Sequence, residues 1–209
     1  MAHLTIHNLG RKDYAEIWKL QHQLVEERIQ GGPDVLLLVE HPHVLTRGSQ
    51  CKGKTMGPQT EADIPIHDVE RGGDATYHGP GQMVGYPILH LKERRLSLSQ
   101  YIRGLEDVLI ETVSPWVKAE RLPGFTGIWA RGKKLASIGV AVRRWVTYHG
   151  LALNVNTDLS YFNLIYPCRL EPSQMTSLKQ LCGQPIPSQK VSHHFTQCFQ
   201  TCFGFVKLG

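Results

Sequence analysis

Residues 126–155 read TGIWARGKKLASIGVAVRRWVTYHGLALNV, and this stretch decides the fold of the chain. It holds three segments rich in Ile, Val, Ala and aromatic residues, at 126–130, 134–142 and 146–155, with short turns between them. Such segments bounded by turns are typical of β-strands, and strands joined by tight turns pair antiparallel. The stretch therefore predicts successive strands of one sheet.

Helical spacing occurs on both sides of this stretch. Residues 14–30 place Tyr14, Ile17 and Val25 on one face and end at Gly-Gly-Pro, while residues 98–113 follow a capping-box pair, Ser97 and Gln100. Further strands are expected at 35–39, 63–69 and 84–89. A last helix is expected along an apolar face made of Val191, Phe195, Cys198, Phe199, Cys202 and Phe203. We predict an α/β (α+β) fold, a single domain over 1–209 whose mixed, largely antiparallel sheet is flanked by helices.

The composition is that of a globular protein, with 41% hydrophobic and 20% charged residues in a chain of 209. No apolar run reaches the roughly 18 residues of a membrane helix, and the N-terminus has no apolar signal segment, so we expect a cytoplasmic protein. The five cysteines form no CxxC pair, which argues against a disulfide framework and leaves room for a reactive thiol. The net charge of +5 favours acidic partners, among them nucleic acid, anionic lipid and acidic carrier proteins.

The most glycine-rich stretch is RGGDATYHGPGQ, residues 71–82. Its glycines let the backbone approach a ligand closely, and Arg71, Thr76, Tyr77 and His78 supply hydrogen-bond donors and an aromatic wall. It lacks the GK[ST] of a phosphate-binding loop and the GxGxxG of a dinucleotide site. Two interpretations stay open: a ligand-binding loop, or a Gly/Pro surface turn between two strands.

Four further residues are candidates for catalysis or for lining a site. Lys134 opens an apolar run, so it is either part of a solvated hairpin tip or a partly desolvated lysine that takes and returns protons. Gly150 and Ala152 alternate on a strand, where they either leave space for a ligand or let the strand pack tightly. Cys168 stands in a loop beside Arg169, either as a small core residue or as a thiol whose ionisation the nearby cation favours.

Together these segments resemble one family, the lipoyl(octanoyl) transferases, also called octanoyl-acyl-carrier-protein:protein N-octanoyltransferases. The resemblance covers nearly the whole chain and rests on RGGDATYHGPGQ (71–82), KLASIG (134–139), HGLALNVNTDL (149–159) and YPC (166–168), in that order. It implies a catalytic domain similar to those of biotin and lipoate protein ligases. The implied reaction carries an octanoyl group from octanoyl-acyl carrier protein to a lysine of lipoyl domains, as the first step of endogenous lipoate biosynthesis. These domains belong to 2-oxo acid dehydrogenases and to the glycine cleavage H protein, and no cofactor is implied.

The resemblance also implies roles for single residues. It places the acyl-thioester nucleophile at Cys168, and at Lys134 the lysine that favours its thiolate. The implied substrate-binding residues are Arg71, Gly72, Gly73, Asp74, Ala75, Thr76, Tyr77 and His78, then Ser137, Ile138 and Gly139, and finally Gly150, Leu151 and Ala152. His78 and His149 are either further donors in the site or hydrogen-bonded core histidines. No metal site is expected.

Three alternatives stay open. ATP-dependent lipoate- or biotin-protein ligases share the implied fold, although they need no nucleophilic cysteine and biotin ligases carry a GRGR-type loop that is absent here. Basic clusters such as Arg94-Arg95 and Arg143-Arg144-Trp145 would suit a non-catalytic nucleic-acid-binding module or an acidic carrier. A zinc site could be made of His193, His194, Cys198 and Cys202, since the two cysteines lie one helical turn apart and His194 one turn earlier, although both cysteines also fall on an apolar stripe. We expect an acyltransferase with protein partners, and neither nucleic acid nor membrane among them.

Overall fold

The computed structural model describes residues 4–51, 63–166 and 171–205. Within these residues, β1 (Leu4–Arg11), β2 (Asp34–Glu40), β6 (Gln82–Ile88), β7 (Ile128–Ala130), β8 (Lys133–Arg143) and β9 (Val146–Asn154) form a six-stranded sheet in the order β1-β2-β6-β9-β8-β7. β1 and β2 are parallel, and the other neighbours are antiparallel. A three-stranded sheet has the order β4-β3-β5 and consists of β3 (Val44–Arg47), β4 (Ile66–Asp68) and β5 (Ala75–His78). The predicted mixed, largely antiparallel sheet is confirmed.

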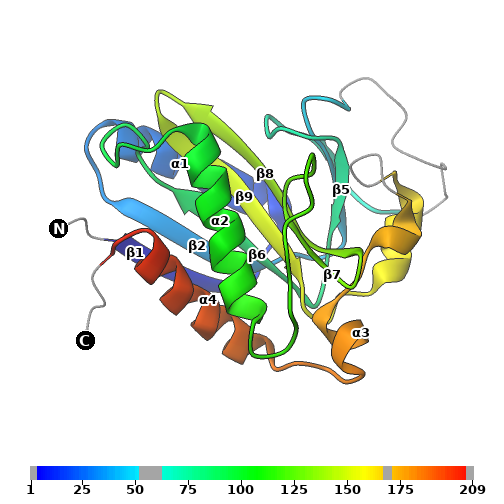
Figure 1. Ribbon diagram of the computed structural model, residues 1–209. Helices are drawn as coiled ribbons and strands as arrows, with labels where there is room; N and C mark the ends of the chain where they lie inside the picture. The colour runs from blue at the N-terminus through cyan, green and yellow to red at the C-terminus, as the bar shows by residue number, and fades with distance from the viewer. Residues whose placement is uncertain (1–3, 52–62, 167–170, 206–209) are drawn as a thin grey trace.

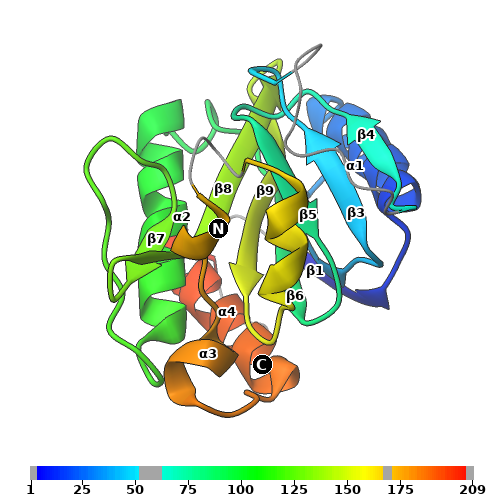
Figure 2. The ribbon, with the colours of Figure 1, turned by 90° about the vertical axis from the view of Figure 1, so that its right-hand side faces the viewer.

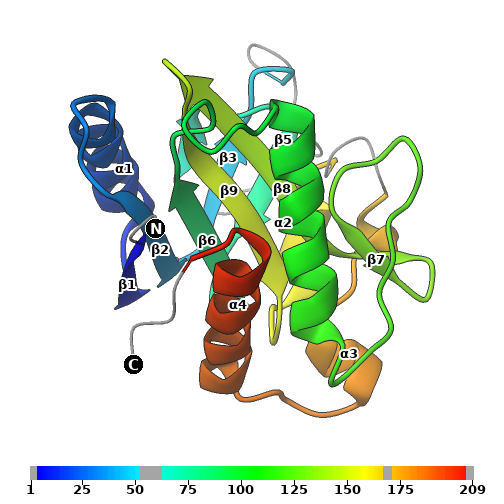
Figure 3. The same cartoon turned by 60° about the vertical axis from the view of Figure 1, so that its left-hand side comes forward.

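Helices cover both faces of the large sheet. α2 (Leu98–Val113) and α4 (Ser188–Cys202) pack side by side on one face and bury an apolar cluster with the strands (Figures 1 and 3). α1 (Tyr14–Ile29) packs on the other face against β6 and β9, on the side where the small sheet also lies (Figure 2). Between β9 and α4 come η1 (Leu159–Leu164), η3 (Pro172–Gln174) and α3 (Leu178–Cys182). None of the helices in the described ranges is both long enough and apolar enough to cross a bilayer.

Local signals place most of these elements where the sequence predicts them. The predicted capping box of α2 is confirmed, because Ser97 Oγ accepts the Gln100 N–H at 3.2 Å and Gln100 Oε1 accepts the Ser97 N–H at 2.9 Å. β1, β3 and β5 have no predicted counterpart. β5 lies inside 71–82, so the interpretation of that stretch as one continuous loop or turn is wrong: its residues pair with β3.

The apolar face of α4 is narrower than predicted. Val191, Phe195 and Phe199 are fully buried, whereas Cys198 is half-buried and Cys202 is exposed. The core contact of this helix therefore rests on its valine and phenylalanines, and Cys202 lies at its edge.

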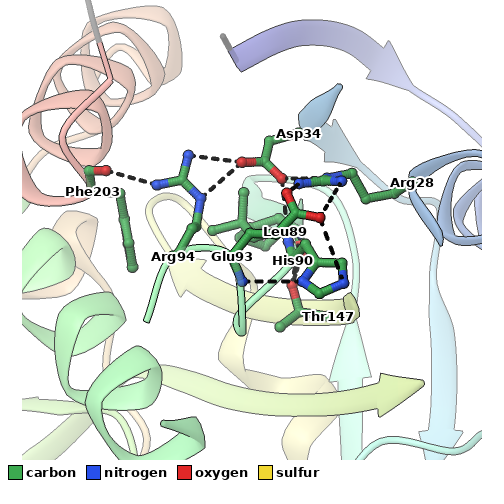
Figure 4. A network of polar contacts seen from close by, with 9 residues as sticks. Arg28, Asp34, Leu89, His90, Glu93, Arg94, Thr147 and Phe203 are labelled. Atoms are coloured by element: carbon green, nitrogen blue, oxygen red, sulfur yellow. Dashed lines mark hydrogen bonds and ion pairs between the residues drawn. The ribbon is translucent and has the colours of Figure 1, made fainter. Parts of the chain in front are cut away.

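A buried ionic network joins elements that are distant in the sequence (Figure 4). Asp34, at the start of β2, accepts hydrogen bonds from Arg28 Nε of α1 at 2.7 Å and from Arg94 Nε at 2.8 Å. Arg94 also donates through Nη1 to the Phe203 carbonyl oxygen at 2.9 Å, beyond the end of α4. Because Asp34 is almost fully buried, removing it would leave two guanidinium groups without their shared anion. The network fixes α1 and the end of α4 to the start of β2.

Candidate active site

A pocket lies beside α1, with walls from β5, β6, β8, β9 and the loop that precedes β5. The three predicted substrate-binding segments all contribute to its wall, through Arg71, Gly72, Gly73, Thr76, His78, Ser137, Ile138, Gly139, Gly150, Leu151 and Ala152. Antiparallel pairing brings them together, because Gly139 faces Gly150 and Ser137 faces Ala152 across β8 and β9. His149 lines the same pocket.

Three of the predicted residues do not line this pocket: Asp74, Ala75 and Tyr77. Side chains alternate along a strand, so Tyr77 points to the opposite face of β5 from His78. Its ring stacks on Tyr161 with centroids 5.1 Å apart, and its hydroxyl bonds to His43 Nδ1 at 2.8 Å. Tyr77 thus supports the wall of the pocket from behind.

Three wall residues have no counterpart among the predicted site residues: Tyr14, Val84 and Tyr86. The helical period does identify Tyr14 as an inward-facing residue of α1. Its place in the pocket comes from the packing of α1 against β6 and β9, which is a long-range property of the fold.

Two glycines of the wall, Gly139 and Gly150, are required by close approaches of the backbone. A Cβ at Gly150 would overlap the Gly85 carbonyl oxygen of β6, and a Cβ at Gly139 would lie 3.1 Å from the Gly72 carbonyl oxygen. For Gly150 the tight-packing interpretation is therefore confirmed. The pocket lies beside these contacts, and its width depends on them.

Arg71 is held by β3 at the base of the pocket loop. Its Nη2 donates to the Thr46 carbonyl oxygen at 3.0 Å and to Thr46 Oγ1 at 2.8 Å, and its Nη1 donates to the Gly72 carbonyl oxygen at 3.1 Å. The side chain is buried. Arg71 therefore brings a positive charge to the pocket and also fixes the shape of its loop.

Glu70, directly before this loop, joins the loop to α1 and to β9. Its Oε2 accepts from Trp18 Nε1 of α1 at 3.1 Å and from His149 Nε2 of β9 at 3.2 Å, and its Oε1 lies 3.4 Å from His22 Nε2. The hydrogen bond from His149 lowers the pKa of Glu70 to about 2, whereas burial lowers the pKa of His149 itself. Both pKa shifts agree with a neutral His149 that donates a hydrogen bond to an ionised Glu70.

His149 also has an unusual backbone. Its φ is +54°, in the left-handed region that non-glycine residues rarely adopt. The buried Gln21 of α1 accepts the His149 N–H at 2.8 Å through Oε1. A contact from the helix therefore supports the strained residue next to Gly150.

Two more histidines beside the pocket are buried and neutral. His41 Nδ1 lies 2.8 Å from the Lys12 carbonyl oxygen, an acceptor, so Nδ1 donates and Nε2 accepts the Tyr86 hydroxyl at 2.9 Å. Burial lowers the pKa of His41, and burial, aided by His41, lowers the pKa of His78 to about 3. Both side chains therefore stay uncharged near neutral pH.

The structure places Lys134 in the interior, near the start of β8. Its side chain is buried, with Nζ 5.0 Å from the centre of the Trp129 ring, while Lys133 is exposed. The interpretation of Lys134 as a solvated hairpin residue is therefore wrong. Its carbonyl oxygen accepts the Thr176 N–H at 3.0 Å. Cys168 lies outside the described residues.

The residues considered for zinc have other contacts. His194 Nδ1 lies 3.0 Å from the Thr112 carbonyl oxygen, and Cys202 Sγ donates to the Gly104 carbonyl oxygen at 3.6 Å. These contacts fasten α4 to α2.

Comparison with known proteins gives the family. The model of the lipoyl protein ligase A/B catalytic domain matches residues 13–200. The chain is 44% identical to an octanoyltransferase of Solibacter usitatus, over 100% of this chain and 96% of that protein, and 46% identical to one of Syntrophotalea carbinolica, over 95% and 93%.

The fold is also found in distant solved structures. Lipoate-protein ligase A bound with ATP has a TM-score of 0.74 at 15% identity, covering 99% of this chain and 88% of that one. Biotin protein ligase from Aquifex aeolicus, in complex with biotin and ATP, has a TM-score of 0.57 at 14% identity, covering 98% and 71%. Because the family model matches residues 13–200 of its 209 residues, this chain belongs to the lipoyl protein ligase A/B catalytic domain family.

Proposed function

We propose that this enzyme is an octanoyltransferase, which carries an octanoyl group from acyl carrier protein to a lysine of lipoyl domains. The observation that carries the proposal is the similarity to octanoyltransferases along nearly the full length of both chains. The acceptors would be the lipoyl domains of 2-oxo acid dehydrogenases and the glycine cleavage H protein. The whole chain, 1–209, would form one catalytic domain, working in the cytoplasm, where Cys168 stays reduced.

The first step would be an exchange of thioesters. The Cys168 thiolate attacks the octanoyl carbonyl carbon, the carbon–sulfur bond to the carrier breaks, and the carrier sulfur leaves with a proton from Lys134, which thereby becomes neutral. An unperturbed cysteine has a pKa of about 8.5, so the thiolate is scarce near neutral pH. A cationic Lys134 would stabilise that thiolate.

The second step would form the amide. The acceptor amine attacks the Cys168 thioester, the carbon–nitrogen bond forms, and the carbon–sulfur bond breaks. Neutral Lys134 would take the proton that the amine loses and return it to the departing sulfur. Because an amide replaces a thioester, this step draws the sequence forward.

The pocket supports binding of a medium-length acyl chain. Val84, Ile138, Leu151 and Ala152 give it apolar side chains, and each buried methylene contributes about 0.8 kcal/mol. Arg71, Thr76 and His78 give it polar groups as well. Such a wall suits a ligand that has an apolar tail and a polar end.

Mass spectrometry tests the covalent step. After incubation with octanoyl-carrier protein, the intact protein should gain one octanoyl group, and peptide mapping should place it on Cys168. Cys168→Ala should gain none, and a normal transfer rate in this variant would exclude the mechanism. Incubation with ATP and free octanoate is the parallel arm, because release of pyrophosphate would indicate a ligase instead.

A further inference from the structure

A chain of hydrogen bonds connects the strand of Lys134 with His78. The Thr176 N–H donates to the Lys134 carbonyl oxygen at 3.0 Å, and Asn154 Nδ2 donates to the Thr176 carbonyl oxygen at 3.0 Å. Gln82 Nε2 bonds to Asn154 Oδ1 at 2.9 Å, and Gln82 Oε1 bonds to His78 Nδ1 at 2.8 Å. The three side chains are all buried, each at 7% exposure or less.

In this series of hydrogen bonds, each atom can act either only as a donor or only as an acceptor. A backbone carbonyl oxygen only accepts, so the amide of Asn154 must present Nδ2 to Thr176 and Oδ1 to Gln82. Gln82 must then present Nε2, which also lies 3.3 Å from the Tyr77 carbonyl oxygen, another acceptor. Its Oε1 is thereby left facing His78, and the proton of that ring must stand on Nδ1.

The charge state of the ring follows from its surroundings. Arg71, His41, His149 and Tyr14 are the charged or titratable groups around it. Burial lowers the pKa of His78 to about 3, so a second proton is absent at neutral pH. With Nδ1 protonated and the ring neutral, Nε2 carries a lone pair.

We propose that Gln82 and Asn154 are positioning residues, which hold His78 with Nε2 unprotonated so that it accepts a hydrogen bond from the acceptor amine. This rests on the proposed function, because the amine is the N–H donor that the second step brings to the thioester. An imidazole this weakly basic does not take the proton of the amine, which goes to Lys134. His78 would instead turn the lone pair of the nitrogen toward the carbonyl carbon.

Nitrogen-15 NMR of the histidine rings tests the tautomer without any assumption about function. The signal missing from His78→Phe identifies this ring among the 11 histidines. The wild-type ring should show a protonated Nδ1 and a bare Nε2 from pH 6 to 8. A protonated Nε2 in this range would overturn the proposal.

The two half-reactions test the role. Gln82→Met keeps the length of the side chain and removes its hydrogen bonds to His78, to Asn154 and to the Tyr77 carbonyl oxygen, so the tautomer is no longer fixed. Transfer from isolated octanoyl-enzyme to an unmodified lipoyl domain should slow about three- to tenfold, as expected for a lost hydrogen bond. Loading of Cys168 from octanoyl-carrier protein should stay within about twofold. Equal slowing of both steps, or of neither, would overturn the proposal.

Asn154→Ala and Asn156→Ala form the matched pair. Asn156 also bonds to a backbone carbonyl oxygen, that of Ile186 at 2.7 Å, but it lies outside this chain of contacts. Only Asn154→Ala should change the ring signals of His78 and slow the second step. If wild-type protein forms no octanoyl adduct, the proposed function fails, and the NMR result still decides the tautomer.

Discussion

Both sides of the six-stranded sheet bury apolar clusters, but the side of α1 and the small sheet also buries a set of polar side chains around the pocket. On one side, α2 and α4 bury a continuous apolar cluster that includes Leu105, Leu109, Phe195 and Phe199. On the other side, between α1 and the small sheet, the interior contains buried histidines, Arg71 and Gln21, each with hydrogen bonds to specific partners. An apolar contact needs only matching shapes, whereas each buried polar group around the pocket also needs a hydrogen-bond partner.

This difference separates stability from activity. Apolar burial is non-directional and stabilises the fold in proportion to area. Buried polar groups contribute little net stability, but they fix orientations that a reaction requires. Variants on the α2–α4 side should therefore change stability, and variants in the pocket or at Lys134 should change activity.

Lys134→Met should separate activity from stability most sharply. We expect octanoyl transfer to fall by about 10²- to 10⁴-fold, the usual contribution of a proton-transfer group. The free energy of unfolding should stay the same or rise, because a methionine of similar length needs no solvation of a buried charge. Single-turnover transfer and urea unfolding measure the two effects. Lys133→Met, at the exposed neighbour, is the control, and a parallel loss of stability and activity in Lys134→Met would contradict the separation.

Phe195→Ala should lower stability and leave activity nearly unchanged. The ring is fully buried between α4 and the sheet, and its loss should lower the free energy of unfolding by about 3–5 kcal/mol. At a temperature where the variant is folded, its kcat should remain within a few-fold of wild type. Phe125→Ala is the control at an exposed phenylalanine. A kcat that falls with the stability would show that the two sides are coupled.

The sequence predicts a helix on each side of the sheet closely, since α1 is expected at 14–30 and observed at Tyr14–Ile29. α2 also begins and ends at the predicted residues. Its signals are local, since the Ser97–Gln100 capping box marks the start and the helical spacing of apolar residues continues to Val113. β5 escapes prediction because it is four residues long and lies in a glycine-rich stretch, and its pairing with β3 is a long-range contact.

In the pocket too, the sequence predicts local features and misses those that depend on long-range packing. Motif resemblance finds the segments of 71–78, 137–139 and 150–152, which then meet through strand pairing. It misses Tyr14, Glu70 and Gln21, whose roles exist only because α1 packs beside β9. Nothing in the local sequence around Glu70 indicates that its carboxylate meets two side chains from a helix about fifty positions earlier and one from β9.

Acid should destabilise the polar side selectively. The pKa of His78 is lowered to about 3 in the fold, against about 6.5 in the unfolded chain. Between these values the unfolded chain binds a proton that the native state does not, so stability falls as the pH falls, by at most about 1.4 kcal/mol per pH unit. His78→Phe should flatten this slope between pH 6.5 and 5. Urea unfolding at several pH values measures it, and identical slopes in the two proteins would contradict the neutral state of His78.

Glu70→Gln should cause the smallest loss of stability and should also change the preference for acyl chain length. An amide cannot accept from Trp18, His22 and His149 as the carboxylate does, so the loop of Arg71 and the strand of Gly150 should lose part of their connection. We expect a loss of about 1 kcal/mol in the free energy of unfolding, together with a several-fold broader preference among hexanoyl, octanoyl and decanoyl donors.

The stability difference has its own pH signature. The pKa of Glu70 is lowered to about 2, so its stabilisation is present above the unfolded value near 4.3 and is lost as the pH falls toward 2. Wild type and Glu70→Gln should therefore converge in stability below about pH 4. Glu16→Gln, at an exposed carboxylate of α1, should change neither stability nor chain-length preference. A variant that loses stability but keeps the wild-type ratio of hexanoyl, octanoyl and decanoyl transfer would show that Glu70 supports only the fold. A changed ratio would mean that this contact, made outside the pocket, sets the width of the space in which the acyl chain lies.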